Sequence, residues 1–256
     1  MNQIRNEPQN GIRKIVFGES RGGKKLEEYQ WGDQDKSILF LSGFAPQDAP
    51  AAELLRSWIQ QLAQGKITSK FNLNSLKSRC RIRCIPLLNP DRCKINRIGI
   101  DDIFEKRFEI NKNRQNSPQT AEKNRLVDLN RNFNADWIKM HRENPRRTDL
   151  GPFPESEPET AALTRRMKGD LPAAAVILRY GENVVYYPPQ ATERERREAL
   201  LLSRAGGLRC ARKDDGEGSA LLWLTGRGVK AVEIEMDGKG SAEGWEETWF
   251  LCAGLT

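Results

Sequence analysis

The sequence predicts an α/β fold with a mixed, mostly parallel central sheet and helices on both faces. Short continuous apolar runs such as Ser37–Gly43 are typical of strands that are buried on both faces. In other segments, such as Ala51–Ala63, apolar residues recur with helical period. Strands that alternate with helices favour this fold. Nothing along the 256 residues marks a boundary, so we expect one domain, 1–256.

The remaining elements continue the alternation. Further strands are expected over Arg81–Leu88, Ala174–Leu178, Tyr186–Pro189 and Val229–Met236, and further helices over Ser156–Met167, Glu193–Arg204, Leu221–Leu224 and Glu243–Cys252. In the first of these helices Ser156 and Glu159 have the spacing of a capping box, and Pro158 suits an early helical position. The polar, Asn-rich stretch 92–125 predicts a long excursion.

Composition and charge exclude several classes of partner. The net charge is +7, but the basic residues are mixed with 35 acidic ones, and only 7% of residues are aromatic. The arginines Arg79, Arg81 and Arg83 alternate on one strand face, yet no nucleic-acid module occurs, so nucleic acid is not an expected partner. No apolar run approaches the ~20 residues that span a bilayer. The polar N-terminus lacks a signal peptide, which predicts a cytoplasmic protein without membrane contact.

Three features suggest chemistry but have simpler interpretations. The five cysteines show no CxxC spacing, and Cys80 and Cys84, four residues apart on a strand, are expected to pack rather than bind metal. The segment Gly18–Gly22 matches G-x-S-x-G, but no helix follows it as a nucleophile elbow requires. The only histidine, His141, lies in a polar stretch and is expected to be exposed or to cap a helix.

Five motifs then occur in an order that resembles the M14 zinc carboxypeptidases. They are GESRGG at 18–23, PLLNPD at 86–91, VDLNRNF at 127–133, GP at 151–152 with SEPET at 156–160, and VEI at 232–234. The resemblance covers residues 14–240, and the compact length is similar to that of bacterial murein-peptide amidases. It implies a carboxypeptidase-like fold.

The resemblance also implies a metal site, from which this sequence departs. In the family two histidines and a glutamate hold zinc, which activates water. The corresponding positions fall on Ala45, Asp48 and Arg179. His141 is the only histidine and lies elsewhere, so it cannot supply the two missing histidine ligands. We therefore expect no metal ligands and no bound cofactor, although zinc is the cofactor of the family.

Other family positions are kept. The resemblance assigns substrate-carboxylate binding to Asn130 and Arg131, and the position of the catalytic base to Glu233, here expected to be vestigial. A further family arginine falls near position 121, where either Arg114 or Arg125 could stand in for it. Arg179 would add a fixed positive charge for substrate binding, and we predict that it bridges Asp48 and Glu233 in place of the metal.

These residues favour a catalytically inactive peptidase homologue that binds a peptide carboxylate or another small anionic ligand. Two alternatives stay open at this point. The first is an active peptidase or amidase with a non-standard metal site or a metal-free mechanism. The second is a structural or interaction protein with a basic surface. The sequence does not indicate a protein partner.

Overall fold

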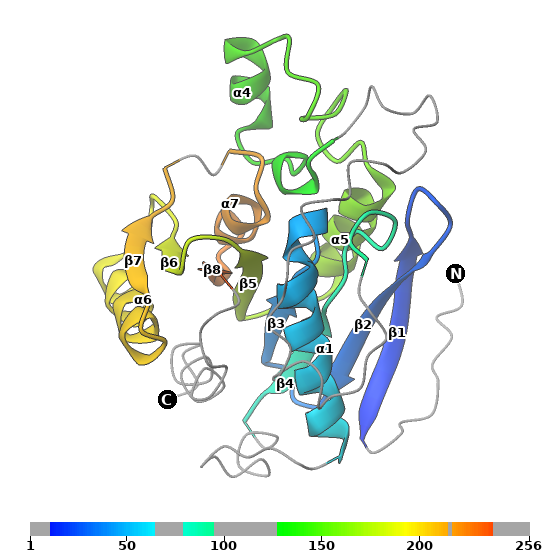
Figure 1. Ribbon diagram of the computed structural model, residues 1–256, viewed down its shortest axis with the longest axis vertical. Helices are drawn as coiled ribbons and strands as arrows, with labels where there is room; N and C mark the ends of the chain where they lie inside the picture. Colours follow the sequence, from blue (N-terminus) through cyan, green and yellow to red (C-terminus); the bar gives the residue numbers. More distant parts are fainter. Residues whose placement is uncertain (1–10, 65–78, 95–126, 215–216, 238–256) are drawn as a thin grey trace.

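The computed structural model describes residues 11–64, 79–94, 127–214 and 217–237 (Figure 1). At its centre is an eight-stranded sheet with the order β1-β2-β4-β3-β5-β8-β6-β7. The strands are β1 (Ile12–Glu19), β2 (Lys25–Trp31), β3 (Ser37–Leu41), β4 (Arg81–Ile85), β5 (Ala174–Tyr180), β6 (Val184–Tyr187), β7 (Arg209–Arg212) and β8 (Lys230–Met236).

The centre of the sheet is parallel and its flanks are mixed. Strands β4, β3, β5 and β8 are parallel neighbours. On one flank β2 pairs antiparallel with β4 and β1 antiparallel with β2. On the other flank β6 pairs antiparallel with β8, and β7 is parallel to β6. The predicted α/β fold with a mixed, mostly parallel sheet is confirmed.

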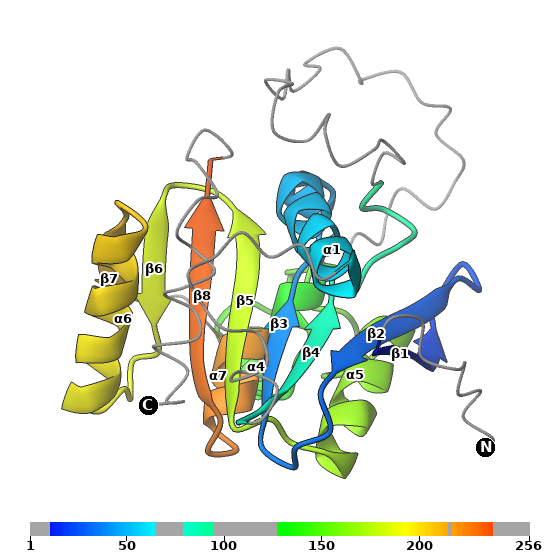
Figure 2. The same ribbon diagram turned by 90° about the horizontal axis from the view of Figure 1, so that it is seen from below.

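Helices cover both faces of the sheet (Figure 2). They are α1 (Ala49–Gln64), α4 (Trp137–Glu143), α5 (Pro158–Gly169), α6 (Glu193–Ala205) and α7 (Ala220–Thr225), with 3-10 turns η1 (Pro46–Asp48) and η3 (Leu129–Arg131). Side chains of α1 and α6, such as Trp58 and Leu202, pack into one buried apolar cluster with the sheet. Side chains of α5 and α7, such as Leu163 and Trp223, pack into a second cluster on the opposite face. All five residues of β3 are buried, as their apolar run predicts.

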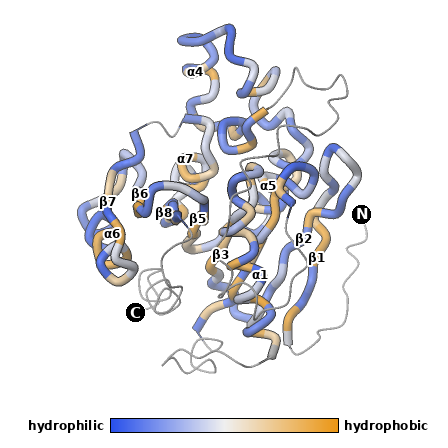
Figure 3. Tube along the Cα trace, viewed as in Figure 1, coloured by the Kyte–Doolittle hydropathy of each residue, from blue (hydrophilic) through white to orange (hydrophobic). Residues whose placement is uncertain are grey.

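The sequence did not reveal α4, β1 or β7. The two strands are the edges of the sheet, where a partly exposed strand needs no apolar run. Around α4 the chain is mostly hydrophilic (Figure 3), and Trp137 and Met140 anchor this short helix in a small cluster with Leu150. His141 stacks on the Trp137 ring with centroids 4.9 Å apart, so the expectation of an exposed or capping side chain is corrected.

The capping box predicted at Ser156 is wrong. Helix α5 has Glu157 as its N-cap, with Pro158 at the first position, and no side chain caps it. The Ser156 hydroxyl instead accepts a hydrogen bond from Asn132, and Glu159 accepts one from the backbone N–H of Arg21. Long-range partners therefore replaced the local capping pattern. The predicted helix Glu243–Cys252 and most of the stretch 92–125 lie outside the described residues.

Candidate functional site

The polar residues singled out in the sequence gather where the central parallel strands end. Asp48 follows β3 through a tight turn, and Arg179 lies near the end of β5. Gly43 makes the turn possible, because its φ is +72° and a Cβ there would meet the Pro86 carbonyl oxygen at 2.8 Å. Asn89 of the PLLNPD segment donates a hydrogen bond to the Phe44 carbonyl oxygen at 3.0 Å. Gly43 and the PLLNPD segment thus hold the turn that presents Asp48.

Asp48 is completely buried, and its carboxylate is saturated with hydrogen bonds. One oxygen accepts from Arg179 Nε at 2.9 Å and from the backbone N–H of Tyr180 at 3.2 Å. The other accepts from the backbone N–H groups of Phe44 and Ala45 at 3.1 and 3.0 Å. Burial raises the pKa of Asp48, while Arg179 and the backbone donors act in the opposite direction. A carboxylate has about four acceptor positions, so none is left for another ligand.

Within the described parts of the chain, Arg179 is anchored at only one of its three nitrogens. Among the described residues, Asp48 alone accepts a hydrogen bond from this guanidinium, and it does so from Nε. The group lies 5.3 Å from the centroid of the Phe44 ring, and its side chain is 12% exposed. Burial would lower the pKa of Arg179, but Asp48, Glu233 and Asp128 raise it, so the side chain stays cationic. In arginine generally, the two terminal nitrogens form an edge that can bind a carboxylate.

Glu233 forms its ion pair with a different cation from the predicted Arg179. This buried side chain lies 3.0 Å from Lys213 Nζ, and Asn130 donates a weak hydrogen bond to it at 3.4 Å. The predicted Arg179 bridge is therefore correct at Asp48 and wrong at Glu233, where Arg179 acts only through its charge. Lys213 follows the edge strand β7, which the sequence did not reveal, so no local signal pointed to it.

Most of VDLNRNF builds the scaffold. The Asn130 amide is occupied at both ends, since its oxygen also accepts from the backbone N–H of Ala220. Asn132 ties the loop before α5 to η3, and Phe133 packs in the core against Trp223. Arg131 is 28% exposed, and its Nε lies 3.8 and 3.9 Å from the carboxylates of Asp128 and Asp149. Arg131 is thus far more accessible than Asn130 and Asn132, which are buried.

The family of this chain is shown by its match to a family model. The zinc carboxypeptidase (peptidase M14) family model matches residues 1–244. The chain belongs to this family. A search of curated proteins gave no match.

Solved structures agree with the fold of the zinc carboxypeptidases. Carboxypeptidase A from Helicoverpa armigera matches with a TM-score of 0.69 at 15% identity, covering 95% of this chain and 68% of that one. Bovine thrombin-activatable fibrinolysis inhibitor, solved in complex with tick carboxypeptidase inhibitor, gives 0.63 at 18%, covering 96% and 87%. Murein-tripeptide amidase MpaA from Escherichia coli O157 gives 0.54 at 18%, covering 100% and 97%.

The side chains at the expected metal positions do not fit the zinc of this family. Ala45 has no donor atom, Asp48 is saturated, and Arg179 places a positive charge beside it. Over the described parts of the chain, no three His, Cys, Asp or Glu residues gather as a metal site would require. Zinc ligands in proteins are imidazole, thiolate and carboxylate groups, not guanidinium. No catalytic step through a metal can be derived from these residues.

The other features that suggested chemistry have structural roles. The Ser20 hydroxyl accepts a hydrogen bond from the backbone N–H of Lys24 in the β1–β2 turn, which no helix follows. Burial raises the pKa of the Cys80 thiol to about 11 and that of Cys93 to about 12, and Cys84 is also buried. These thiols stay protonated. Arg114 and Arg125 lie outside the described residues.

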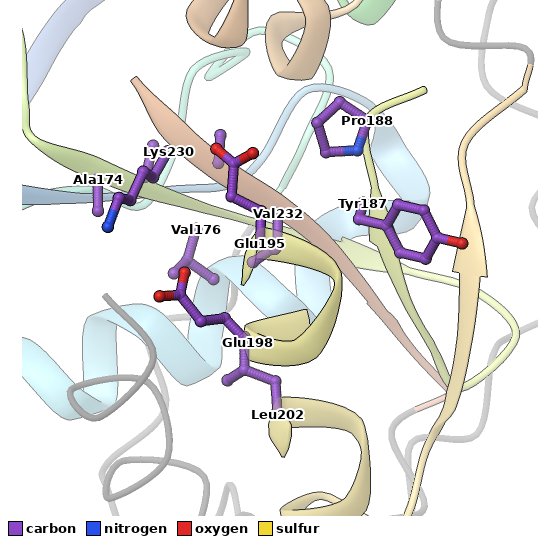
Figure 4. A pocket seen from close by; sticks show the side chains of 11 residues that line it. Ala174, Val176, Tyr187, Pro188, Glu195, Glu198, Leu202, Lys230 and Val232 are labelled. Atoms are coloured by element: carbon purple, nitrogen blue, oxygen red, sulfur yellow. The ribbon is translucent and has the colours of Figure 1, made fainter. Parts of the chain in front are cut away.

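A hollow lies away from these residues, between α6 and the starts of β5 and β8 (Figure 4). Ala174, Val176 and Val232 line its apolar side. Its two acids already have partners, because Glu195 accepts hydrogen bonds from Thr192 and Glu198 accepts one from Arg194. The hollow therefore lacks the converging polar groups that occur around Asp48 and Arg179 at the ends of the parallel strands.

In the described parts of the chain, no helix is both long enough and apolar enough to cross a membrane.

Proposed function

We propose that this zinc carboxypeptidase family member does not hydrolyse peptides through zinc and instead binds a small anionic ligand, such as a peptide carboxylate. The saturation of Asp48 carries the proposal. The four donors around Asp48 include Arg179, so the position that would bind a metal instead fixes a guanidinium. The change replaces a Lewis acid with an anion-binding group.

The proposed binding mode follows from how Arg179 is held. Asp48 anchors the guanidinium at Nε, and the two terminal nitrogens donate no hydrogen bond to the described residues. Two parallel N–H groups match a carboxylate in a bidentate, charge-assisted pair. Arg131, held loosely by two carboxylates at nearly 4 Å, is the second cation we assign to the ligand. Asn130 positions Glu233 rather than the ligand.

A matched pair of probes tests the proposed ligand class. N-acetyl-Ala-Ala and its C-terminal carboxamide differ only in the negative charge, and calorimetry would measure both. We expect the carboxylate to bind at least about tenfold more tightly, and Arg179→Met to abolish the difference. Circular dichroism would check that the variant is folded. Equal binding of the two probes by the wild type would contradict the proposal.

Metal analysis tests the absence of zinc chemistry. Protein purified without an affinity tag should contain far less than one transition metal ion per chain. The triple variant A45H/D48E/R179H, which supplies two imidazoles and a longer carboxylate, serves as the matched control and should gain zinc. A stoichiometric metal in the wild type, with metal-dependent release of amino acids from peptides, would establish the alternative of an active peptidase.

A further inference from the structure

Lys213 is almost completely enclosed by acidic and aromatic groups. Its Nζ lies 3.0 Å from an oxygen of Glu233, 3.2 Å from an oxygen of Glu235 and 4.1 Å from the centroid of the Tyr186 ring. The side chain is 13% exposed. One ammonium therefore serves two carboxylates of the same strand, β8, and a cation–π contact orients it.

Both carboxylates lie beside the proposed binding group. In the register between β5 and β8, Arg179 is directly opposite Glu235, and Glu233 is opposite Ile177, two residues earlier. Side chains alternate along a strand, so these four residues share one face of the sheet. The negative charge of Glu233 acts on Arg179 strongly enough to help raise the pKa of the guanidinium.

Without Lys213, these two negative charges would work against an anionic ligand. They would repel a carboxylate that approaches Arg179, and they would offer the guanidinium an internal partner. Lys213 neutralises them from the side of β6 and β7, away from Asp48, because it follows β7 and its backbone N–H binds the Tyr187 carbonyl.

We propose that Lys213 is a positioning residue that makes the site selective for negatively charged ligands. It neutralises Glu233 and Glu235 and so leaves the terminal nitrogens of Arg179 free to bind an external anion. This inference rests on the proposed function and adds to it. The ligand it selects carries a carboxylate or a similar anion at the end that meets Arg179. Lys213 itself does not touch the ligand, because its contacts are with protein groups.

A double-mutant cycle tests this role, with N-acetyl-Ala-Ala as the probe. Lys213→Met should weaken binding about tenfold, because Glu233 and Glu235 become uncompensated. Adding Glu233→Gln removes one of the two charges and should recover most of the lost affinity. Simple loss of packing at Lys213 could not be reversed by a substitution at Glu233. Lys230→Met is the matched control, since Lys230 is a half-buried lysine of β8 without an ion pair among the described residues, and its binding should not change.

The outcomes separate this inference from the proposed function. If Arg179→Met abolishes binding while Lys213→Met binds like the wild type, the proposed function stands and the role of Lys213 is wrong. The proposed role of Lys213 is also wrong if the double variant, Lys213→Met with Glu233→Gln, binds no better than Lys213→Met alone. If the wild type does not distinguish the carboxylate from the carboxamide, both proposals are overturned.

Discussion

Two buried ion networks in this protein differ in how completely their arginines are used. The first joins β2, β4 and α5 around Glu28 and Arg83, which are both fully buried. Arg83 donates from Nε and both terminal nitrogens, and Arg166 adds two hydrogen bonds to Glu28. The second network contains Asp48 and Arg179, and there only Nε has an acceptor among the described residues.

This difference distinguishes a network that only stabilises the fold from one that can bind a ligand. In the first network every charge has its partners inside the protein, so the network fixes how α5 packs on the sheet and offers nothing to a ligand. In the second, the carboxylate is saturated but the guanidinium is not. The terminal nitrogens of Arg179 donate to none of the described residues and are not among the buried unpartnered atoms, so a ligand or solvent can complete this network.

The first network shows what two of the alternating arginines do. Arg83 is completely buried, and the Arg81 side chain is bound to Asp170 through two hydrogen bonds of 2.9 Å. These two arginines are therefore internal partners of acids rather than part of a basic surface.

The largest effect is expected for Glu28→Gln. This change removes the carboxylate that Arg83 and Arg166 share and leaves them only Asp170, at 3.6 and 3.4 Å. Breaking a buried pair in this way costs about 3–5 kcal/mol of unfolding free energy. Urea denaturation would measure it. The control Glu182→Gln removes the exposed partner of Arg209 and should leave stability unchanged. Equal effects of the two substitutions would show that the network is not a scaffold.

Acidification should affect the first network strongly. Burial alone would raise the pKa of Glu28, but the guanidinium groups of Arg83 and Arg166 outweigh it and hold this pKa below its ordinary value. The folded state therefore binds this proton less readily than the unfolded chain. The stability from Glu28 is present above the ordinary glutamate pKa of about 4.3 and is lost as the pH falls through the lower folded value.

The pH dependence can be assigned by comparing variants. Unfolding free energies measured from pH 6 downward should fall more steeply for the wild type than for Glu28→Gln, which lacks the titrating group. Parallel curves for the two proteins would place the acid sensitivity elsewhere in the molecule.

An intermediate effect is expected for Asp48→Asn. The side chain keeps its shape, but its amide nitrogen would face backbone N–H donors, which costs about 1–3 kcal/mol. The penalty should stay below that of Glu28→Gln, because Arg179 is partly exposed and solvent can receive its charge. The same variant should weaken binding of N-acetyl-Ala-Ala, since the guanidinium loses its anchor. Unchanged affinity with lowered stability would restrict Asp48 to a structural role.

The smallest change in stability is expected for Arg131→Gln. Its ion pairs are long and its side chain is partly exposed, so the unfolding free energy should hardly change. The affinity for the carboxylate probe should fall several-fold if Arg131 contacts the ligand, as the proposed function requires. Arg147→Gln is the control, because this arginine shares Asp149 with Arg131 but is not assigned to the ligand.

The sequence alone determined the parts of this protein that depend on local patterns. The apolar run of β3, the helical period of α1 and the helix α6 appear in the structure at nearly the expected residues. The motif VDLNRNF indicated the family, which the family match to residues 1–244 supports. The absence of imidazoles at positions 45 and 179 could also be inferred, because it depends only on residue identity.

Apart from the predicted pair of Arg179 and Asp48, only the tertiary structure decided which buried charges meet. Lys213 reaches Glu233 because β7 and β6 lie beside β8, although 20 residues separate the two in sequence. Likewise Arg83 is buried because Glu28 and α5 come to it from distant parts of the chain. A charged side chain can be placed in the interior only when a partner is present, and strand order supplies that partner. Local patterns contain no record of strand order, so the pairs Arg83–Glu28 and Lys213–Glu233 could not be predicted. The pair Arg179–Asp48 could be, because the family resemblance placed both residues at one site.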